Sequence, residues 1–168
     1  MLSAVRRGGP SDLLATEVDH DPAASFRSTH KRHPPRYLHA SHFRIDEENV
    51  YVLSDFCAGG SLRGMLQTFT RLTENQAKYI AIQVISALDY LHSVSCLHAS
   101  LLAENVLLDG EGVVHLTGFS HSLVNVPLPC YQMIGFVEQM SPEMLLNKGI
   151  DYSYDWYLLG CLLYGESG

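Results

Sequence analysis

The sequence predicts an α+β domain, in which a pair of antiparallel strands precedes a mainly helical region. Two observations lead to this class. Strand-forming residues fill two segments between Arg36 and Phe56, and apolar residues recur at helical spacing from Ala77 onward. Over 168 residues, the hydrophobic share of 46% and the charged share of 17% favour one folded core over a disordered chain.

The first strands are expected after an irregular start. Residues 1–32 mix glycine, proline, serine, histidine and charges without a sustained period, so a flexible segment is predicted, with a short helix near 12–18 as its one candidate element. The segments RYLHASHFRI (36–45) and VYVLSDF (50–56) then read as two antiparallel strands joined by the acidic turn DEEN. Gly59 and Gly60 close the second strand.

The clearest helix is predicted over TENQAKYIAIQVISALDYLH, residues 73–92. Thr73 can cap its start, and Gln76, three residues later, can complete a capping box. Five apolar residues then recur every three or four positions and predict one buried stripe: Ala77, Ile80, Val84, Leu88 and Leu91.

Three more elements follow the long helix. NVLLD (105–109) and VVHLT (113–117) predict a short hairpin, in which Asp109 and two glycines supply the turn chemistry. Pro127 and Pro129 mark a loop, and SPEMLL (141–146) begins a second helix. DWYLLGCLLYG (155–165) predicts an apolar helix, so Trp156 and the leucines after it are expected in the core.

Composition narrows the class of partner. The formal net charge is −7, from 11 Lys and Arg against 18 Asp and Glu, so general attraction to nucleic acid or anionic lipid is not expected. The four cysteines are widely spaced, which suits a reducing, cytoplasmic setting. The longest apolar run, residues 157–164, is far shorter than the roughly 20 residues of a membrane span. A protein partner is therefore expected.

The order of these elements and motifs resembles that of the eukaryotic protein kinase domain. In that family the catalytic loop, the metal loop and the A-P-E motif follow one another in the same order along the chain. The resemblance runs from about His33 to Gly168, and FCAGGSL and DYSYDWYLLGCLLY are most similar to the AGC group of serine/threonine kinases. It implies a partial small lobe of two strands at about 33–56. An incomplete, mainly helical large lobe at about 57–168 would follow.

The resemblance also implies that the residues for phosphate chemistry have been replaced. His98 and Asn105 match the histidine and the asparagine of the catalytic loop. Ser100 stands at the catalytic aspartate, Leu102 at the loop lysine and Gly118 at the metal-binding aspartate. A neutral hydroxyl is a poor proton acceptor, and glycine offers no side chain to a metal ion.

On the nucleotide side, neither a glycine-rich loop nor the ATP-binding lysine precedes residue 36. By position alone, the resemblance leaves four weak candidates for nucleotide contact: Asp55, Cys57, Asn105 and Leu107. It implies structural roles for five residues: His98, Phe119, Glu143, Asp155 and Trp156.

The leading hypothesis is a catalytically inactive pseudokinase that acts by binding another kinase or signalling protein, with no cofactor. One alternative is a divergent serine/threonine kinase that binds ATP and Mg²⁺, which requires a carboxylate such as Asp109 or Glu104 to hold the metal. A further alternative is a truncated product without function. The family packs more helices around its apolar anchor helix, so an exposed C-terminal helix and self-association through it are expected here.

The histidines suggest a separate metal hypothesis. His30 with His33, and His39 with His42, have a spacing that occurs in zinc sites. No cysteine or carboxylate cluster nearby completes four ligands, so an exposed strand face is the favoured interpretation of the second pair.

Overall fold

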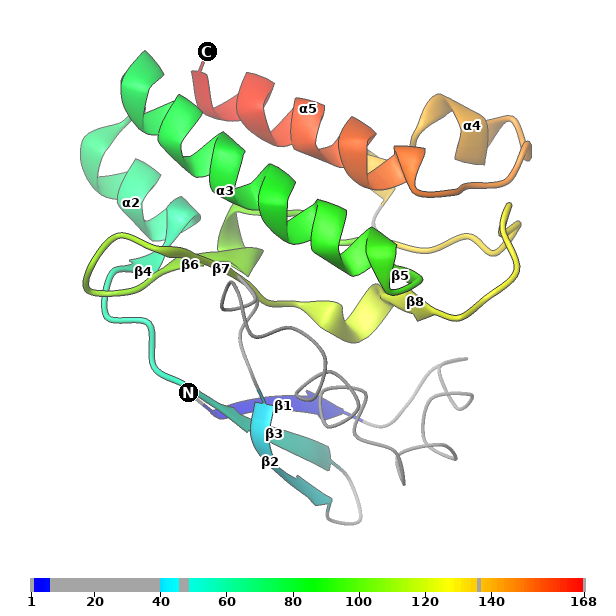
Figure 1. Ribbon diagram of the computed structural model, residues 1–168, viewed down its shortest axis with the longest axis horizontal. Helices are drawn as coiled ribbons and strands as arrows, with labels where there is room; N and C mark the ends of the chain where they lie inside the picture. The colour runs from blue at the N-terminus through cyan, green and yellow to red at the C-terminus, as the bar shows by residue number, and fades with distance from the viewer. Residues whose placement is uncertain (1, 7–39, 46–48, 136, 168) are drawn as a thin grey trace.

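The computed structural model describes residues 2–6, 40–45, 49–135 and 137–167. Figure 1 shows a small antiparallel sheet at one side of the molecule and the long helices α3 (Glu74–Ser93) and α5 (Ser153–Ser167) side by side at the other. Short strands and turns fill the space between them. The α+β class predicted from the sequence is confirmed.

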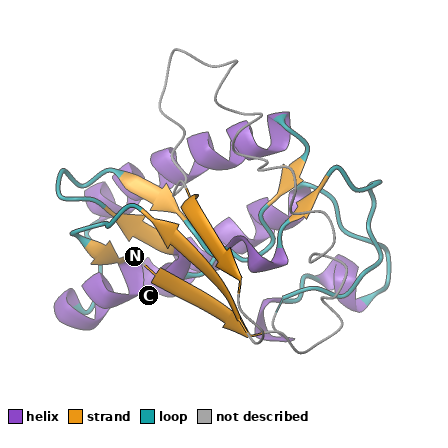
Figure 2. Cartoon of the chain, turned by 90° about the horizontal axis from the view of Figure 1, so that it is seen from below, coloured by secondary structure: helices purple, strands orange, loops and turns teal. Residues whose placement is uncertain are grey.

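The small sheet has three strands in the order β1–β3–β2, all antiparallel (Figure 2). Strands β2 (Ala40–Ile45) and β3 (Asn49–Ser54) confirm the predicted pair. Strand β1 (Leu2–Arg6) lies in a segment predicted to be irregular, so the prediction of two strands was one short. Its partner lies more than 40 residues away, a pairing that local sequence patterns do not reveal. The candidate helix near 12–18 falls outside the described residues.

A second sheet begins at the glycine turn. Strand β4 (Gly60–Ser61) pairs with β6 (Val106–Leu108), and a Cβ at Gly59 would lie only 2.8 Å from the carbonyl oxygen of Asp109. Glycine therefore lets the two backbones approach. Helix α2 (Leu62–Phe69) follows and was not predicted. The Ser61 hydroxyl caps it by accepting a hydrogen bond from the Gly64 amide at 3.1 Å.

Helix α3 begins one residue after its predicted start and ends one residue after its predicted end. The capping box is present: the Gln76 amide donates to Thr73 Oγ1 at 3.3 Å, and the Thr73 amide donates to Gln76 Oε1 at 2.9 Å. Four residues of the predicted stripe are buried, whereas Ala77 is half-buried. Gln83 and Ala87 complete the buried face.

The predicted hairpin is confirmed as β6 and β7 (Val114–Leu116). Asp109 forms its turn, because Oδ1 accepts hydrogen bonds from the Glu111 amide at 2.9 Å and the Val113 amide at 2.8 Å. Strand β5 (Cys96–Leu97) pairs with β8 (Leu123–Val124) in a third small sheet.

Short helices complete the order of elements. They are the 3₁₀ turns η1 (Ala103–Asn105), η2 (Phe119–His121) and η3 (Val137–Gln139), and helix α4 (Pro142–Leu145), which Ser141 caps. Among the described residues, no helix combines the length and the apolar character needed to cross a membrane.

The core lies between α3, α5 and the β6–β7 hairpin. Leu158, Leu159 and Leu162 of α5 are buried as predicted. The expectation that Trp156 belongs to the core was wrong, since its side chain is 39% exposed and its ring packs edge-on against His92. Trp156 thus contacts α3 at the margin of the packed face, where part of its side chain stays in contact with water.

Candidate functional site

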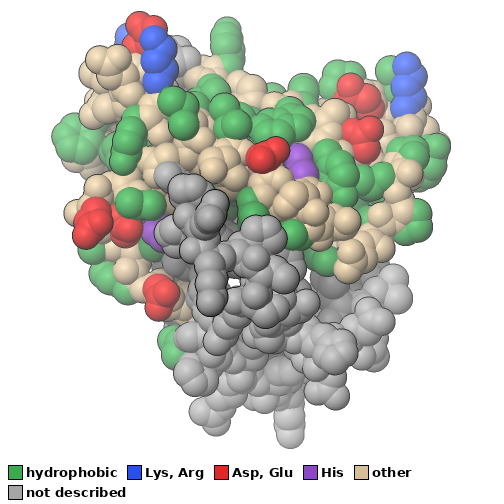
Figure 3. Space-filling model, in the orientation of Figure 1, with side chains coloured by type: hydrophobic (Ala, Val, Ile, Leu, Met, Phe, Trp, Pro, Cys, Tyr) green, Lys and Arg blue, Asp and Glu red, His purple; other side chains and the backbone are tan. Residues whose placement is uncertain are grey.

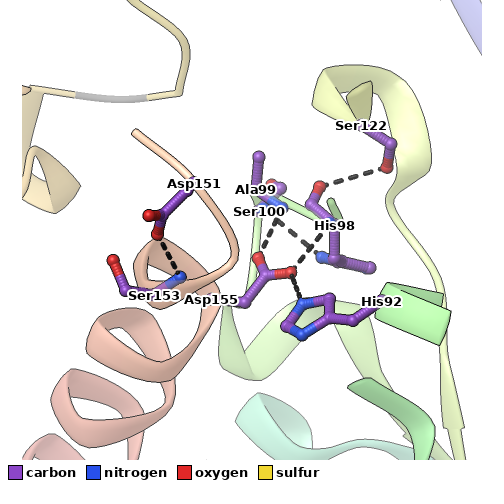
Figure 4. A network of polar contacts seen from close by, with 8 residues as sticks. All are labelled: His92, His98, Ala99, Ser100, Ser122, Asp151, Ser153 and Asp155. Atoms are coloured by element: carbon purple, nitrogen blue, oxygen red, sulfur yellow. Dashed lines mark hydrogen bonds and ion pairs between the residues drawn. The ribbon is translucent and has the colours of Figure 1, made fainter. Parts of the chain in front are cut away.

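The candidate site is built around the carboxylate of Asp155, in the first turn of α5, which is completely buried. Asp155 Oδ2 accepts a hydrogen bond from the His98 amide at 2.9 Å, and Oδ1 accepts one from the Ala99 amide at 2.8 Å (Figure 4). Ala99 has a positive φ of 59°, an uncommon conformation for a residue other than glycine. The carboxylate thus fixes the turn that starts the 98–105 loop.

His92, at the end of α3, is the third partner of this carboxylate. Its Nε2 lies 2.7 Å from Asp155 Oδ2, and its ring also packs on Tyr152 with centroids 4.6 Å apart. The sequence-based prediction omitted His92. A signal was present, because His92 continues the four-residue repeat of Ile80, Val84 and Leu88 on the buried face.

His98 is fully buried and its hydrogen bonds determine its protonation. Nε2 lies 3.0 Å from the carbonyl oxygen of Thr117, which only accepts, whereas Nδ1 lies 3.3 Å from the Ser100 amide, which only donates. These partners select the neutral ring with the proton on Nε2. Burial lowers the pKa of His98 below its ordinary value, although Asp155 and the Thr117 carbonyl act in the opposite direction. The Phe119 ring packs edge-on against His98 at 4.8 Å.

Asn105 and Ser100 face each other across the loop. Asn105 Nδ2 donates to the Ser100 carbonyl at 2.8 Å and lies 3.2 Å from Ser100 Oγ. Ser100 is buried, at 3% exposure. The amide of Asn105 is therefore committed to its own loop.

Gly118 lies directly beside that amide. A Cβ at position 118 would lie 2.3 Å from Asn105 Cγ and 2.4 Å from both terminal atoms of the Asn105 side chain. The backbone at Gly118 is left-handed, with φ 81°. With Asn105 in this position, no residue larger than glycine fits at position 118.

A magnesium ion does not fit the residues at this position. Mg²⁺ is usually held through carboxylate oxygens, and this site offers one amide oxygen, one hydroxyl and a glycine. Among the described residues, no group of three or more His, Cys, Asp or Glu side chains is placed to hold a metal ion. His30, His33 and His39 lie outside the described residues, and His42 lies in β2.

The metal-binding alternative depends on two carboxylates, Asp109 and Glu104. Asp109 is occupied in the hairpin turn, where its Oδ2 also lies 3.1 Å from His115 Nε2. The hydrogen bond from the Val113 amide is the main cause that lowers the pKa of Asp109, followed by His115. Glu104 is exposed.

The residues predicted for nucleotide contact lie in different segments and differ in burial. Leu107 is buried in β6, whereas Asp55 is exposed in the segment after β3. Cys57 is buried, and burial raises the pKa of its thiol, with smaller contributions from Asp109 and Asp55. Leu102, which the sequence predicts at the loop-lysine position, is half-buried.

Two more polar residues support the loop or the hairpin below it. The Ser122 hydroxyl donates to the His98 carbonyl at 3.1 Å (Figure 4). Gln83 Oε1, inside the apolar face of α3, accepts from the Val114 amide at 3.1 Å. Glu143, in contrast, is exposed in α4.

Comparison with known proteins gives a consistent result. The family model "Protein kinase domain" matches residues 28–166. The chain is 36% identical to the cAMP-dependent protein kinase catalytic subunit of Arthrobotrys oligospora over 119 residues, which is 71% of this chain and 23% of that protein.

Two further relatives are serine/threonine-protein kinase PKH2 of Saccharomyces cerevisiae and ribosomal protein S6 kinase alpha-1 of Homo sapiens. PKH2 is 35% identical over 71% of this chain and 12% of its own length. The S6 kinase is 31% identical over 91% of this chain and 20% of its own length. The chain thus spans about a quarter or less of the length of these relatives.

Proposed function

Because the chain belongs to the eukaryotic protein kinase domain family and its relatives include AGC-group kinases, we propose that it is a catalytically inactive kinase-like protein that acts by binding other proteins. One observation carries this proposal. At the position of the family's metal-binding aspartate stands Gly118, and the Asn105 amide fills the adjacent space.

The chemistry of phosphate transfer supports the same conclusion. The reaction needs an acceptor for the proton of the attacking hydroxyl and positive charge near the transferred phosphate. Ser100 provides a buried neutral hydroxyl next to Asn105, and Leu102 provides an apolar side chain. Neither side chain supplies charge, so we propose that the protein neither transfers phosphate nor requires ATP and magnesium.

We assign the segment at about 33–56 to a small lobe and residues from about 57 to 168 to a large lobe. The β2–β3 pair and the helical core from Leu62 onward support this division, and β1 (Leu2–Arg6) adds a strand from outside the 33–56 segment to the same sheet. The widely spaced cysteines support a cytoplasmic location.

The activity test uses the full chain with ATP, Mg²⁺ or Mn²⁺ and an array of serine- and threonine-containing peptides. We expect no phosphate transfer, with a cAMP-dependent kinase catalytic subunit as the positive control. An N105A variant separates true activity from contamination, because a contaminating kinase does not depend on Asn105. Metal-dependent transfer by the wild type that disappears in N105A would contradict the proposal.

A melting series tests nucleotide binding separately. A ligand that binds only the folded protein adds about 2.7 kcal/mol at 100 times its dissociation constant. For a chain of this size that corresponds to a midpoint shift of roughly 5–11 °C. We expect the midpoint to be the same with and without ATP, whether or not Mg²⁺ or Mn²⁺ is added.

The binding role is supported by the exposed apolar side chains of α3 and α5. Hydrophobic side chains reach the surface in the upper part of Figure 3, where these helices lie. The exposed apolar side chains of α3 and α5 include Tyr79 at 54%, Ile82 at 67% and Tyr164 at 83% exposure. We propose that the partner is another kinase or signalling protein, and that α5 also permits self-association.

Sedimentation at increasing protein concentration tests self-association. We expect the apparent mass to rise in the wild type and to rise less in a Y164E variant. Y131E is the matched control, because Tyr131 is also exposed, at 62%, but lies in the loop before α4. Equal association of the wild type and Y164E would contradict a role for α5.

A further inference from the structure

We propose that Asn105 and Gly118 form a matched pair that closes the position where a metal ion would have to bind. In this pair the Asn105 amide occupies the space beside residue 118, and only glycine at 118 leaves room for it. The inference rests on the proposed loss of phosphate transfer and gives that loss a steric cause. Restoring a carboxylate at position 118 alone therefore does not restore a metal site.

The conflict at position 118 is with the whole end of the Asn105 side chain. The three atoms nearest to a Cβ at 118 are Cγ, Nδ2 and Oδ1 of Asn105, at 2.3–2.4 Å. Real Cβ atoms essentially never approach other heavy atoms closer than 3.0 Å. Any side chain at 118 therefore requires Asn105 or the backbone at 118 to move.

Asn105 can move only by giving up its hydrogen bonds. Its Nδ2 donates to the Ser100 carbonyl at 2.8 Å and lies 3.2 Å from Ser100 Oγ. Ser100 is 3% exposed, so water cannot readily replace the lost donor. Displacing the Asn105 side chain thus leaves buried polar atoms without their present partner.

The backbone around Gly118 is also held on both sides. The Thr117 amide donates to the Asn105 carbonyl at 2.9 Å, and the Thr117 carbonyl accepts from His98 Nε2 at 3.0 Å. The Phe119 ring packs on the His98 ring at 4.8 Å. Residues 117 and 119 are therefore tied to the same loop that carries Asn105, and the segment cannot retreat from it without breaking these contacts.

A double-mutant cycle measures the pairing directly. It compares the thermal unfolding midpoints of the wild type, G118A, N105A and N105A/G118A, all as the full chain. Gly112 provides a matched control, because it has the same φ of 81° with no atom within 4 Å of an added Cβ. G112A therefore reports the backbone cost alone, which we expect to lower the midpoint by about 2–8 °C.

We expect G118A to lower the midpoint at least twice as much as G112A. In the N105A background, the same substitution should cost no more than G112A does, because the steric conflict is gone and only the backbone cost remains. That backbone cost is common to both backgrounds, so it cancels when the two costs of G118A are subtracted. If G118A fails to fold, recovery of folding in N105A/G118A supports the pair. Equal losses from G118A in both backgrounds would overturn it.

A metal titration separates this inference from the proposed function. Mn²⁺ binding is followed by electron paramagnetic resonance, with and without ATP, for the wild type and G118D. We expect G118D to bind Mn²⁺ no more tightly than the wild type, and N105A/G118D to unfold at a higher temperature than G118D. Tight Mn²⁺ binding by the single variant G118D would overturn the inference. Tight binding of Mn²⁺ and ATP by the wild type would instead overturn the proposed function, and the double-mutant cycle would then decide whether Asn105 and Gly118 are a matched pair.

Discussion

The carboxylate of Asp155 has three hydrogen-bond partners, and each of them lies more than 50 positions away in the sequence. Two backbone amides and the His92 ring converge on its two oxygens. Its place in the first turn of α5 adds a favourable interaction with the helix dipole. One buried side chain thus joins α3, the 98–105 loop and α5.

We predict that D155A destabilises the protein by about 2–5 kcal/mol, because the amides of His98 and Ala99 lose a buried acceptor. Urea unfolding measures this loss. D151A is the matched control, since exposed Asp151 accepts only from the nearby residue Ser153, through its backbone amide and its hydroxyl, and should cost about 1 kcal/mol or less. Similar losses in the two variants would show that the convergence on Asp155 is not important for stability.

His98 makes stability depend on pH in a defined direction. Burial lowers its pKa in the folded state, so between the two pKa values the unfolded chain binds more protons. Stability should therefore be complete above the unfolded pKa of about 6.5 and fall below it, by at most about 1.4 kcal/mol per pH unit for this group. Urea unfolding from pH 7.5 to 5.5 measures the slope, and H98L should have a shallower slope than the wild type. Parallel slopes would exclude His98 as the cause.

Helix α3 combines a strong local start with one buried face. Thr73 and Gln76 cap its first turn, and the buried side chains from Ile80 to Leu91 lie on the side that packs on α5 and β7. Local and tertiary preferences agree along this helix, which explains why its bounds were predicted to within one residue. Helix α2 repeats Leu62, Met65, Leu66 and Phe69 at helical spacing over its eight residues, but this shorter signal was not used and the helix was not predicted.

We predict that T73A lowers the free energy of unfolding by about 1 kcal/mol, because the Gln76 amide loses its acceptor. Circular dichroism during urea unfolding measures the change. N75A is the control, since Asn75 is exposed in the same turn and alanine favours the helix slightly more than asparagine does. A loss in N75A as large as in T73A would point to the helix end in general rather than to the capping box.

The molecule as a whole depends on a single buried cluster from Leu62 to Leu162 among the residues whose exposure is described. Helix α3 contributes one side to this cluster and exposes the other. Leu88 is completely buried, whereas Ile82, less than two turns earlier, is 67% exposed. The two faces therefore serve different purposes: one holds the fold together and the other is available to a partner.

We predict that L88A destabilises the protein by about 2–5 kcal/mol, from lost burial and the cavity that remains. I82A should change stability by less than about 0.5 kcal/mol and should weaken partner binding if the exposed face is used. Unfolding midpoints in urea compare the two variants. A large loss of stability in I82A would show that this face is covered within the protein itself.

The sequence alone determined the elements whose signals are local: the β2–β3 pair, helix α3 with its capping box, the Asp109 hairpin turn and the helix that Ser141 caps. It also led to the proposal that Ser100, Leu102 and Gly118 stand where the kinase family has charged residues. These features depend on neighbours within a few positions or on residue identity, so no knowledge of packing was needed.

Only the tertiary structure decided which distant residues meet. It paired β1 with β3, placed Trp156 at the surface and brought His92 to Asp155 across 63 positions. It also placed the Asn105 amide in the space beside Gly118. The physical reason is that such contacts depend on how whole elements pack, and periodicity within one element does not specify which partner its faces meet.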